Sequence, residues 1–385
     1  MSAPASVLFE EIACAGGQRI GVARLNAEKS LNALTLDMID LLSARLAAWA
    51  ADPHIALVML EGAGERAFCA GADLLRLHAA CLAHHQSAQR ADLCANSYAL
   101  DFFAREYRLD YLIHTYPKPV LCWGQGVVMG GGMGLMVGAS HRVVTEQVRI
   151  AMPEINIGLY ADVAGSWFLA RAPGHTGLFL ALTAAQLGAS DAIFAGFADY
   201  QIKHERKAAV MEAVLGHVWH KQVARNRRDL SRLLQSFSET EFADGPLRAH
   251  FDLINSLCRH DEPQDIVYEI TTLASADEWL KRAGATLAAG SPTTAVLSIA
   301  LQRRLKHASL AAVFRAELVA SLVCAARPDL AEGIRALLID KDRQPQWRPS
   351  QVADVTVEWI DEFFASPWPA AQHPLADLDC ARPLD

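Results

Sequence analysis

Short apolar runs that end in glycine recur through the first half of the chain and limit its fold more than any other feature. Ile55 to Leu60 is one such run, stopped by Gly62, and Pro119 to Trp123 is another, followed by Gly124-Gln125-Gly126. Runs of this length and composition are typical of buried strands. Thr35 to Ala51 instead has helical spacing behind a threonine able to cap it. Strands that alternate with helices predict an α/β core.

The β signal fades beyond about Ile202, and helical periods dominate the rest of the chain. Leu305 to Ala326, for example, shows Leu, Val and Ala at helical spacing. Prolines divide this part into pieces without a long flexible linker, so it is predicted to pack on the core. We therefore expect an α/β core over residues 1–202 and a helical region over residues 203–385.

Composition excludes several broad classes of protein. A chain of 385 residues with 52% hydrophobic residues can bury a large core, and its net charge of -8 argues against a general nucleic-acid-binding surface. Its eight cysteines form no CxxC pair, which argues against a zinc site and a disulfide framework and favours a reducing compartment. The longest apolar stretch, Val127 to Ala139, is shorter than the roughly 20 residues that cross a bilayer. We expect a cytoplasmic protein with no metal, nucleic-acid or membrane partner.

Two glycine-rich segments follow predicted strands. Gly62 to Asp73 places small residues where a backbone can approach a ligand, but spacing alone favours a tight strand-to-helix turn with Asp73 near the helix start. Gly130 to Leu135 predicts a helix that begins among glycines, whose unpaired amides stabilise a phosphate or the oxyanion of an attacked thioester. A dinucleotide-binding loop is the weaker alternative, because Val128 stands where its middle glycine belongs.

Glu154 and Asp162 lie eight residues apart in an otherwise apolar stretch. Carboxylates are costly to bury unless they have partners or a catalytic task. Spacing alone leaves two interpretations open: a pair of functional acids, or a helix-start residue at Glu154 and a cap at Asp162.

Other candidate residues have a structural explanation. The histidines, among them His141 and the His84-His85 pair, fall in no catalytic motif and are predicted to be structural or surface residues. A set of aromatic residues is spaced for one helix face, which predicts core packing: Tyr98, Phe102, Phe103, Tyr107 and Tyr111.

Taken in order, these motifs resemble the crotonase (enoyl-CoA hydratase/isomerase) superfamily. The resemblance rests on Leu31-Asn32-Ala33-Leu34, Ala67 to Asp73, and Lys118-Pro119 leading to Met129-Gly130-Gly131-Gly132. The 3-hydroxyisobutyryl-CoA hydrolase branch is resembled at Phe102 to Tyr107, Ala151 to Gly158, Ser291-Pro292-Thr293 and Glu332 to Asp342. The resemblance implies a crotonase (ClpP/crotonase-like) fold of repeated β-β-α units with a helical C-terminal region.

The resemblance also implies roles for individual residues. The amides of Ala70 and Gly131 are expected to form the oxyanion hole that holds the thioester oxygen. Glu154 is expected to be the main catalytic carboxylate, with Asp162 as the second functional acid. Substrate contacts are expected at Glu106, Gly71, Ala72, Asp73 and Gly130.

The activity that the resemblance implies is hydrolysis of a short-chain 3-hydroxyacyl-CoA to the free acid and coenzyme A, as in valine breakdown. Coenzyme A is then part of the substrate, and no separate cofactor is expected. Hydratases of the superfamily carry a glutamate where this chain has Gly134, which disfavours hydration of a double bond. The superfamily often forms trimers or pairs of trimers, which leaves homo-oligomerisation open.

Two alternatives to the hydrolase stay open. One is an enoyl-CoA hydratase or isomerase on the same fold. The other is a non-catalytic acyl-CoA-binding paralogue, because Ala161 and Ala164 stand where the hydrolase branch usually has proline and glycine.

Overall fold

The computed structural model describes residues 5–240 and 243–380, which form two compact units. The first unit combines the chain up to Ala72 with Leu112–Ala151 and Gln186–Ala249. The second combines Asp73–Tyr111, Met152–Ala185 and the chain from His250 onward. Neither unit begins or ends at residue 202, where we expected the core to end. Two segments from the first half of the chain, Asp73–Tyr111 and Met152–Ala185, belong to the same unit as the later helices. The outer ends of the two expected regions lie outside the described residues.

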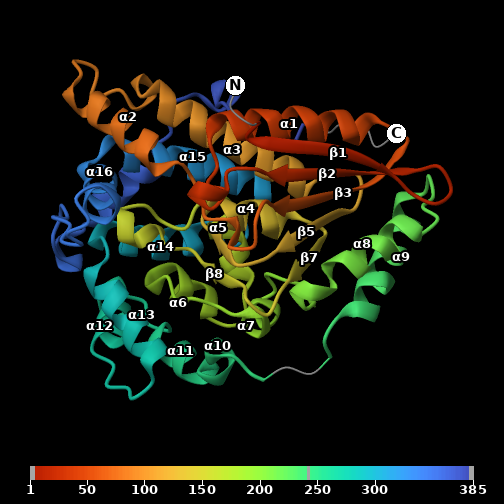
Figure 1. Ribbon diagram of the computed structural model, residues 1–385. Coiled ribbons are helices and arrows are strands. Elements are labelled where there is room, and N and C mark those ends of the chain that lie inside the picture. Colours follow the sequence, from red (N-terminus) through yellow and green to blue (C-terminus); the bar gives the residue numbers. More distant parts are fainter. Residues whose placement is uncertain (1–4, 241–242, 381–385) are drawn as a thin grey trace. The chain divides into compact units, whose positions relative to one another are not determined.

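The larger sheet of the first unit is built from strands far apart in the sequence (Figure 1). Its order is β1 (Val7–Ala13), β2 (Arg19–Leu25), β3 (Ile55–Gly62), β5 (Val120–Gly124), β7 (His141–Val144) and β9 (Tyr200–Gln201). Only the β1–β2 pair is antiparallel. Both β3 and β5 are buried at every position, as continuous apolar runs require. The strands predicted at Ile55 and Pro119 are confirmed as central strands.

A second, smaller sheet holds the parallel strands β4 (Ala67–Cys69), β6 (Val127–Met129) and β8 (Arg149–Ala151). The chain gives one strand to the large sheet and the next to the small one, three times in succession: β3 then β4, β5 then β6, β7 then β8. Gly126 lies between β5 and β6, where the chain passes from the large sheet to the small one. Its φ is 57°, and a Cβ there would lie 2.1 Å from the Arg66 carbonyl oxygen, so the turn requires glycine. This repeat confirms the predicted crotonase-like α/β fold.

Amphipathic helices cover strands within the first unit. The helix α1 (Leu36–Ala51) contacts β1, β2 and β3, and Thr35 Oγ1 caps it by accepting from the Met38 amide at 3.2 Å. Its buried residues include Leu42, Leu46 and Trp49, and each large apolar side chain fully buried contributes about 1.5–3 kcal/mol. The other helices of this unit are α4 (Gly131–Gly138), α7 (Ala189–Phe194), α8 (Lys207–Gly216), α9 (Val223–Phe237) and α10 (Pro246–Ala249).

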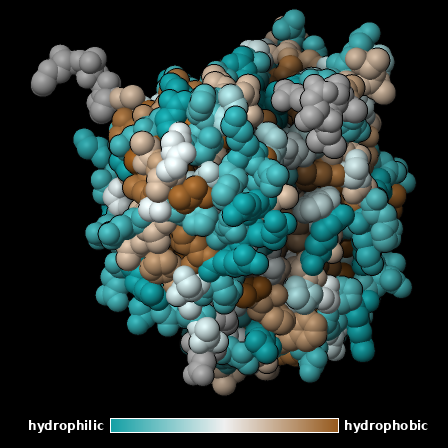
Figure 2. All heavy atoms as spheres, turned by 90° about the vertical axis from the view of Figure 1, so that its right-hand side faces the viewer, coloured by the Kyte–Doolittle hydropathy of each residue, from teal (hydrophilic) through white to brown (hydrophobic). Residues whose placement is uncertain are grey.

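The helix α9 has one buried apolar face and one exposed basic face. Leu230 and Leu234 are buried, while Arg225, Arg227 and Arg228 are exposed. The buried face packs on α8 and β3. The face drawn in Figure 2 mixes hydrophilic and hydrophobic residues.

The second unit is helical. Its α15 (Leu310–Ala326) is buried over most of its length, as expected of a helix that is apolar on all sides. Prolines start three of its helices, and the Ser291 hydroxyl accepts from the Thr294 amide to cap α14, so the predicted divisions are confirmed. The helices are α2 (Leu74–Gln86), α3 (Ser97–His114, up to Tyr111 in this unit), α5 (Gly165–Phe168), α6 (Thr176–Thr183), α11 (Phe251–Leu257), α12 (Pro263–Thr271), α13 (Glu278–Ala289), α14 (Pro292–Arg304), α15, α16 (Pro328–Ile334) and α17 (Val357–Asp361).

No helix within residues 5–240 and 243–380 is both long and apolar enough to cross a membrane alone. The pair α13 and α14 passes that test when joined, but the two helices are bent by 108° at their junction.

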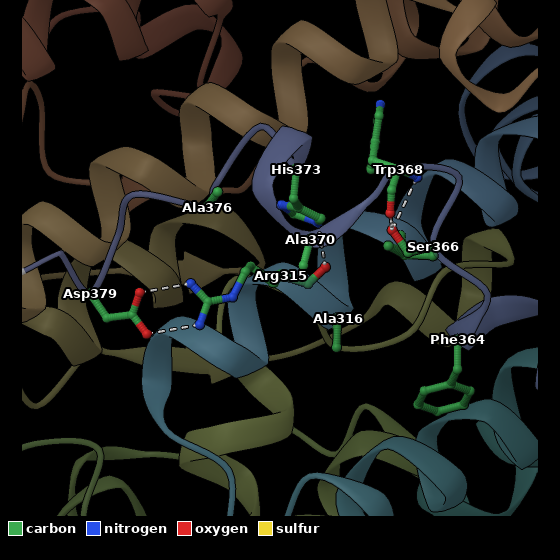
Figure 3. Close-up of a pocket in the computed structure, with 10 residues that line it drawn as sticks. Arg315, Ala316, Phe364, Ser366, Trp368, Ala370, His373, Ala376 and Asp379 are labelled. Atoms are coloured by element: carbon green, nitrogen blue, oxygen red, sulfur yellow. Dashed lines mark hydrogen bonds and ion pairs between the residues drawn. The ribbon is translucent and has the colours of Figure 1, made fainter.

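A cavity of about 530 Å³ lies within the second unit, lined by α15 and by residues from 364 to 379 (Figure 3). Arg315 points toward Asp379 and donates to both of its carboxylate oxygens, at 3.0 and 2.9 Å. The His373 ring accepts from the Leu375 amide and contacts the Arg315 carbonyl oxygen, which fixes its orientation. None of the site residues expected from the sequence lines this cavity.

Candidate active site

Two glycine-rich bends follow the paired strands β4 and β6 in the first unit. Because parallel strands end at the same edge of a sheet, the bends leave it side by side. Gly71 has φ of 105° and Gly130 has φ of 50° with ψ of -123°, conformations that glycine adopts freely and other residues rarely do. A Cβ on Gly71 would lie 3.4 Å from the Met129 carbonyl oxygen and 3.9 Å from the Gly131 nitrogen. The two bends predicted from the sequence therefore meet.

Gly131 offers a free amide at this meeting point. It is the first residue of α4, so its N–H has no acceptor inside the helix, whereas the Met133 and Gly134 amides both donate to the Gly130 carbonyl oxygen. The positive end of the helix dipole adds to its attraction for negative charge. At Gly132 a Cβ would lie 2.3 Å from the Cys69 carbonyl oxygen, so close packing against β4 fixes the start of α4.

The second amide expected for the oxyanion hole is already engaged. The Ala70 amide donates to the Leu31 carbonyl oxygen at 3.0 Å, which conflicts with the role predicted for Ala70. Two residues later, Ala72 forms a bridge with Leu34, and its amide donates to no acceptor in the described part of the chain. The bend thus presents Ala72 rather than Ala70 as a free donor beside Gly71.

Asp73 has the structural role that spacing favoured. Its side chain caps α2 by accepting from the Arg76 amide at 3.4 Å. It is also only partly buried, so a substrate contact stays a prediction for this residue.

In the second unit, the structure brings Glu106, Glu154 and Asp162 together as buried acids. Glu154 starts a short 3₁₀ helix, Glu154–Ile157, three residues after β8 in the sequence. Its Oε2 has no hydrogen-bond partner within the described residues. Burial, followed by the nearby negative charge of Asp162 and then of Glu106, raises the pKa of Glu154 well above its usual value. Burial and Asp162 raise the pKa of Glu106 in the same direction.

Asp162 interacts with both of these acids and is held by an aromatic hydroxyl. The Tyr107 hydroxyl donates to Asp162 Oδ2 at 2.7 Å. Burial raises the pKa of Asp162 to about 6, although this hydrogen bond acts in the opposite direction. The carboxyl group does not cap the next helix, since it is the main-chain oxygen of Asp162 that accepts from the Gly165 amide. The interpretation of Asp162 as a side-chain cap is therefore wrong.

Sequence reasoning missed two acids of this cluster, Asp110 and Glu317. Asp110 follows Glu106 by one turn of α3 and is fully buried, with neither carboxyl oxygen partnered within the described chain. Burial, then Glu106, Asp162 and Glu317, raise its pKa well above the usual value. A signal was available for Glu317, because a carboxylate in the middle of the largely apolar Leu310–Ala326 stretch is rarely buried without a partner.

Glu317 braces the chain just after Asp162. Its carboxylate accepts from the amides of Ala164 at 2.7 Å and Ser166 at 2.9 Å. Val163 and Ala164 both have left-handed backbones, with φ of 51° and 67°, which are costly for residues other than glycine. Burial, and secondarily Asp162, raise the pKa of Glu317 to about 8.

None of these five acids forms an ion pair with a Lys, Arg or His of the described residues. Because like charges repel, the five acids are not all ionised together at neutral pH. The cluster can therefore hold and transfer protons near neutrality, which is the property required of general acids and bases.

The residues predicted to be structural behave as such. Phe102, Phe103 and Tyr107 are buried in the core of the second unit, although Tyr107 also reaches Asp162. His141 contacts Ser140, the Arg227 carbonyl oxygen and Ser231, and His84 contacts the Asp92 carbonyl oxygen.

Comparison with known proteins finds relatives both by sequence and by structure, and the two sets carry different names. A family model described as enoyl-CoA hydratase/isomerase matches residues 20–364. The chain is 37% identical over 368 residues to a Danio rerio protein named 3-hydroxyisobutyryl-CoA hydrolase, mitochondrial, covering 94% of this chain and 90% of that protein. A Homo sapiens protein of the same name is 34% identical over 368 residues, covering 94% and 88%. These names do not support the cytoplasmic location expected from the sequence.

Two solved structures match most of the chain. An enoyl-CoA hydratase from Rhodobacter sphaeroides has a TM-score of 0.81 and 32% identity, covering 94% of this chain and 98% of its own. A carnitinyl-CoA dehydratase from Mycobacterium thermoresistibile has a TM-score of 0.80 and 33% identity, covering 94% and 97%.

Proposed function

The chain belongs to the enoyl-CoA hydratase/isomerase family, and on that premise we propose that it hydrolyses 3-hydroxyisobutyryl-CoA to the free acid and coenzyme A. One observation carries the proposal: Glu154 and Asp162, the two acids expected of the hydrolases, are both buried in one interacting cluster. The named hydrolases resemble the chain over about nine-tenths of its length. The reaction would place the protein in valine breakdown.

In the proposed reaction, ionised Glu154 takes a proton from a water molecule as the water oxygen attacks the thioester carbonyl. The carbonyl oxygen becomes negatively charged, and the Gly131 amide is assigned to stabilise it. When the tetrahedral intermediate collapses, the carbon–sulfur bond breaks and the departing thiolate takes the proton from Glu154. The water hydroxyl thus ends on the acyl group and its proton on sulfur. A raised pKa suits Glu154 to both proton transfers.

We assign the 3-hydroxyl group of the substrate to Asp162. Its carboxyl group is anchored by Tyr107 on one oxygen, so it has a fixed orientation in which to bind a polar group. A site built to hydrogen-bond a substrate hydroxyl rejects an analogue that lacks it, because its own buried polar group is then left unpaired.

The hydratase remains the second candidate, because the two solved relatives carry hydratase and dehydratase names at 32 and 33% identity. Gly134 argues against it. This residue lies buried in α4, where superfamily hydratases keep one of their two carboxylates. Without that acid, addition of water across a double bond lacks one of its proton-transfer groups.

The decisive experiment is a free-thiol release assay over 3-hydroxyisobutyryl-, 3-hydroxypropionyl- and isobutyryl-CoA, run beside a crotonyl-CoA hydration assay. We expect thiol release to be fastest with the hydroxylated substrates and hydration to be negligible. Glu154→Gln should lower kcat by about 100- to 10,000-fold, the usual contribution of general acid–base catalysis.

Glu278→Gln, which makes the same change at an exposed position on α13, is the matched control and should keep full activity. Hydration of crotonyl-CoA faster than thioester hydrolysis, or near-full turnover by Glu154→Gln, would rule the proposal out.

A further inference from the structure

Four buried side chains and one main-chain carbonyl form a continuous line of oxygens in the second unit. Asp162 Oδ2 lies 2.7 Å from the Tyr107 hydroxyl, which lies 2.7 Å from Ser321 Oγ. Ser321 Oγ lies 2.9 Å from the Tyr160 hydroxyl, which donates to the Glu317 carbonyl oxygen at 2.7 Å. All four separations suit O–H···O hydrogen bonds, and the side chains are nearly inaccessible to water.

Counting hydrogens shows that this line is complete only with an extra proton. Four links need four hydrogens, but Tyr107, Ser321 and Tyr160 supply one each. If Asp162 is ionised, Tyr107 donates to it, Tyr160 donates to the Glu317 carbonyl, and Ser321 can fill only one of the two remaining links. A proton on Asp162 supplies the fourth hydrogen, and every hydroxyl then donates in the direction of Glu317.

We propose that Tyr107, Ser321 and Tyr160 form a hydroxyl relay that holds a proton on Asp162, so that the negative charge of the site falls on Glu154. Ser321 and Tyr160 are positioning residues in this scheme, since they act on the substrate only through Asp162. The catalytic use of an ionised Glu154 rests on the proposed function. The relay itself rests on the oxygen–oxygen distances alone. It explains how two neighbouring acids take different protonation states.

The surroundings of Asp162 resist its ionisation, as they also resist that of Glu154. Within residues 5–240 and 243–380, the titratable groups that interact with Asp162 all carry negative charge when ionised: Glu106 and Asp110 of α3, Glu154 of the 3₁₀ helix, Glu317 and Cys324 of α15, and the two tyrosines of the relay. Their negative charges, where present, all resist ionisation of Asp162. Burial raises the pKa of Asp162, and the Tyr107 hydroxyl lowers it by donating to the carboxylate. A Tyr107 that accepts from protonated Asp162 does not exert this lowering effect.

The relay predicts the direction in which each substitution shifts the pH at which Asp162 ionises. A merely structural role predicts no such direction. Tyr160→Phe and Ser321→Ala each remove the link that an ionised Asp162 leaves empty, so each should lower the pH at which Asp162 ionises. Tyr107→Phe instead removes the donor to the carboxylate and should raise that pH. Each shift should be about one pH unit, the equivalent of one ordinary hydrogen bond.

The measurement is infrared difference spectroscopy of the full-length protein across a pH titration. The protonated-carboxyl band that disappears in Asp162→Asn identifies the group, and no turnover is needed. Tyr116→Phe is the matched control, because it removes a buried tyrosine hydroxyl bonded to the Leu46 carbonyl oxygen, outside the relay. The alkaline limb of the kcat/KM profile, where Asp162 loses its proton, should move with the infrared titration.

Downward shifts in Tyr160→Phe and Ser321→Ala with an upward shift in Tyr107→Phe support the relay. If the ionisation pH of Asp162 stays the same or rises in Tyr160→Phe or in Ser321→Ala, the relay is overturned. The test therefore needs only one of these two variants to fold. Loss of the relay pattern with retained thiol release refutes only the relay. Failure of thiol release with the pattern intact refutes only the proposed function.

Discussion

Glu317 Oε2 accepts a hydrogen bond from the Ala164 amide at 2.7 Å, although Ala164 has a left-handed backbone with φ of 67°. Val163 before it is also left-handed, and a β-branched residue in that conformation is a clear outlier. The strained pair follows Asp162 directly, so the buried acid on α15 fixes where Asp162 points. A glycine usual at position 164 in the hydrolase branch would adopt this conformation without strain.

Ala164→Gly is therefore expected to stabilise the protein. Relief of the left-handed strain is worth about 1–2 kcal/mol, and the greater freedom of glycine in the unfolded chain offsets about 0.4–1 kcal/mol of it. The measurement is the free energy of unfolding in urea. Ala48→Gly, at an exposed position inside α1, is the matched control and should be destabilising by about 0.5–1 kcal/mol. Equal destabilisation of both variants would contradict the strain argument.

The free energy of unfolding should fall as the pH rises from about 4.5 to 8. A buried acid whose folded pKa is raised binds its proton more tightly in the folded state, so deprotonation in this window favours unfolding. Glu317, with a pKa of about 8, acts over the upper part of the window, and Asp162, with a pKa of about 6, acts over the lower part. One such group contributes a slope of at most about 1.4 kcal/mol per pH unit.

Glu317→Gln tests that assignment through the slope rather than the absolute stability. Urea unfolding at a series of pH values should show a flatter dependence between pH 6 and 8 in the variant than in the unmodified protein. An unchanged slope would mean that Glu317 does not retain its proton in the folded state.

Gly132→Ala should lower kcat by about 100- to 1000-fold, the usual cost of losing one oxyanion donor. The added Cβ would lie 2.3 Å from the Cys69 carbonyl oxygen, so either β4 or the start of α4 must move and carry the Gly131 amide with it. Gly188→Ala is the matched control, since nothing lies within 4 Å of its Cβ position. Steady-state kinetics with circular dichroism would check both, and a fully active Gly132→Ala would remove the Gly131 amide from the mechanism.

Asp162→Asn should change substrate preference as well as rate. If Asp162 binds the 3-hydroxyl group, kcat/KM should fall at least about 10-fold more for 3-hydroxyisobutyryl-CoA than for isobutyryl-CoA. A parallel fall for both substrates would assign Asp162 to catalysis or structure instead of recognition.

Features with a local cause could be predicted from the sequence. The Thr35 cap, the buried strand at Ile55 and the helix start among Gly130–Gly132 depend on residues a few positions apart, and all three are confirmed. Glu154 and Asp162 were predicted because they match a family motif. The direction of one backbone amide has no such signature, which is why Ala70 was favoured over Ala72 on either side of the same glycine.

Features that depend on distant partners could not be predicted. Glu317 and Ala164 are 153 residues apart, and Tyr107 and Ser321 are 214 apart. Periodicity indicates that α3 and α15 are helices, but it does not indicate which side chains of each will meet. For the same reason the sequence predicted a boundary at residue 202, where strand residues give way to helical ones, rather than the interleaved units.

That interleaving has a consequence for synthesis on the ribosome. The edge of β7 stays unpaired until Tyr200 and Gln201 emerge, and α3 cannot find its buried partners on α15 until residue 326 has been made. An incomplete chain therefore has an unpaired strand edge, and the acids of α3 lack their partners on α15; exposure of this kind favours aggregation of folding intermediates. No single break in the chain separates all the residues of one unit from those of the other.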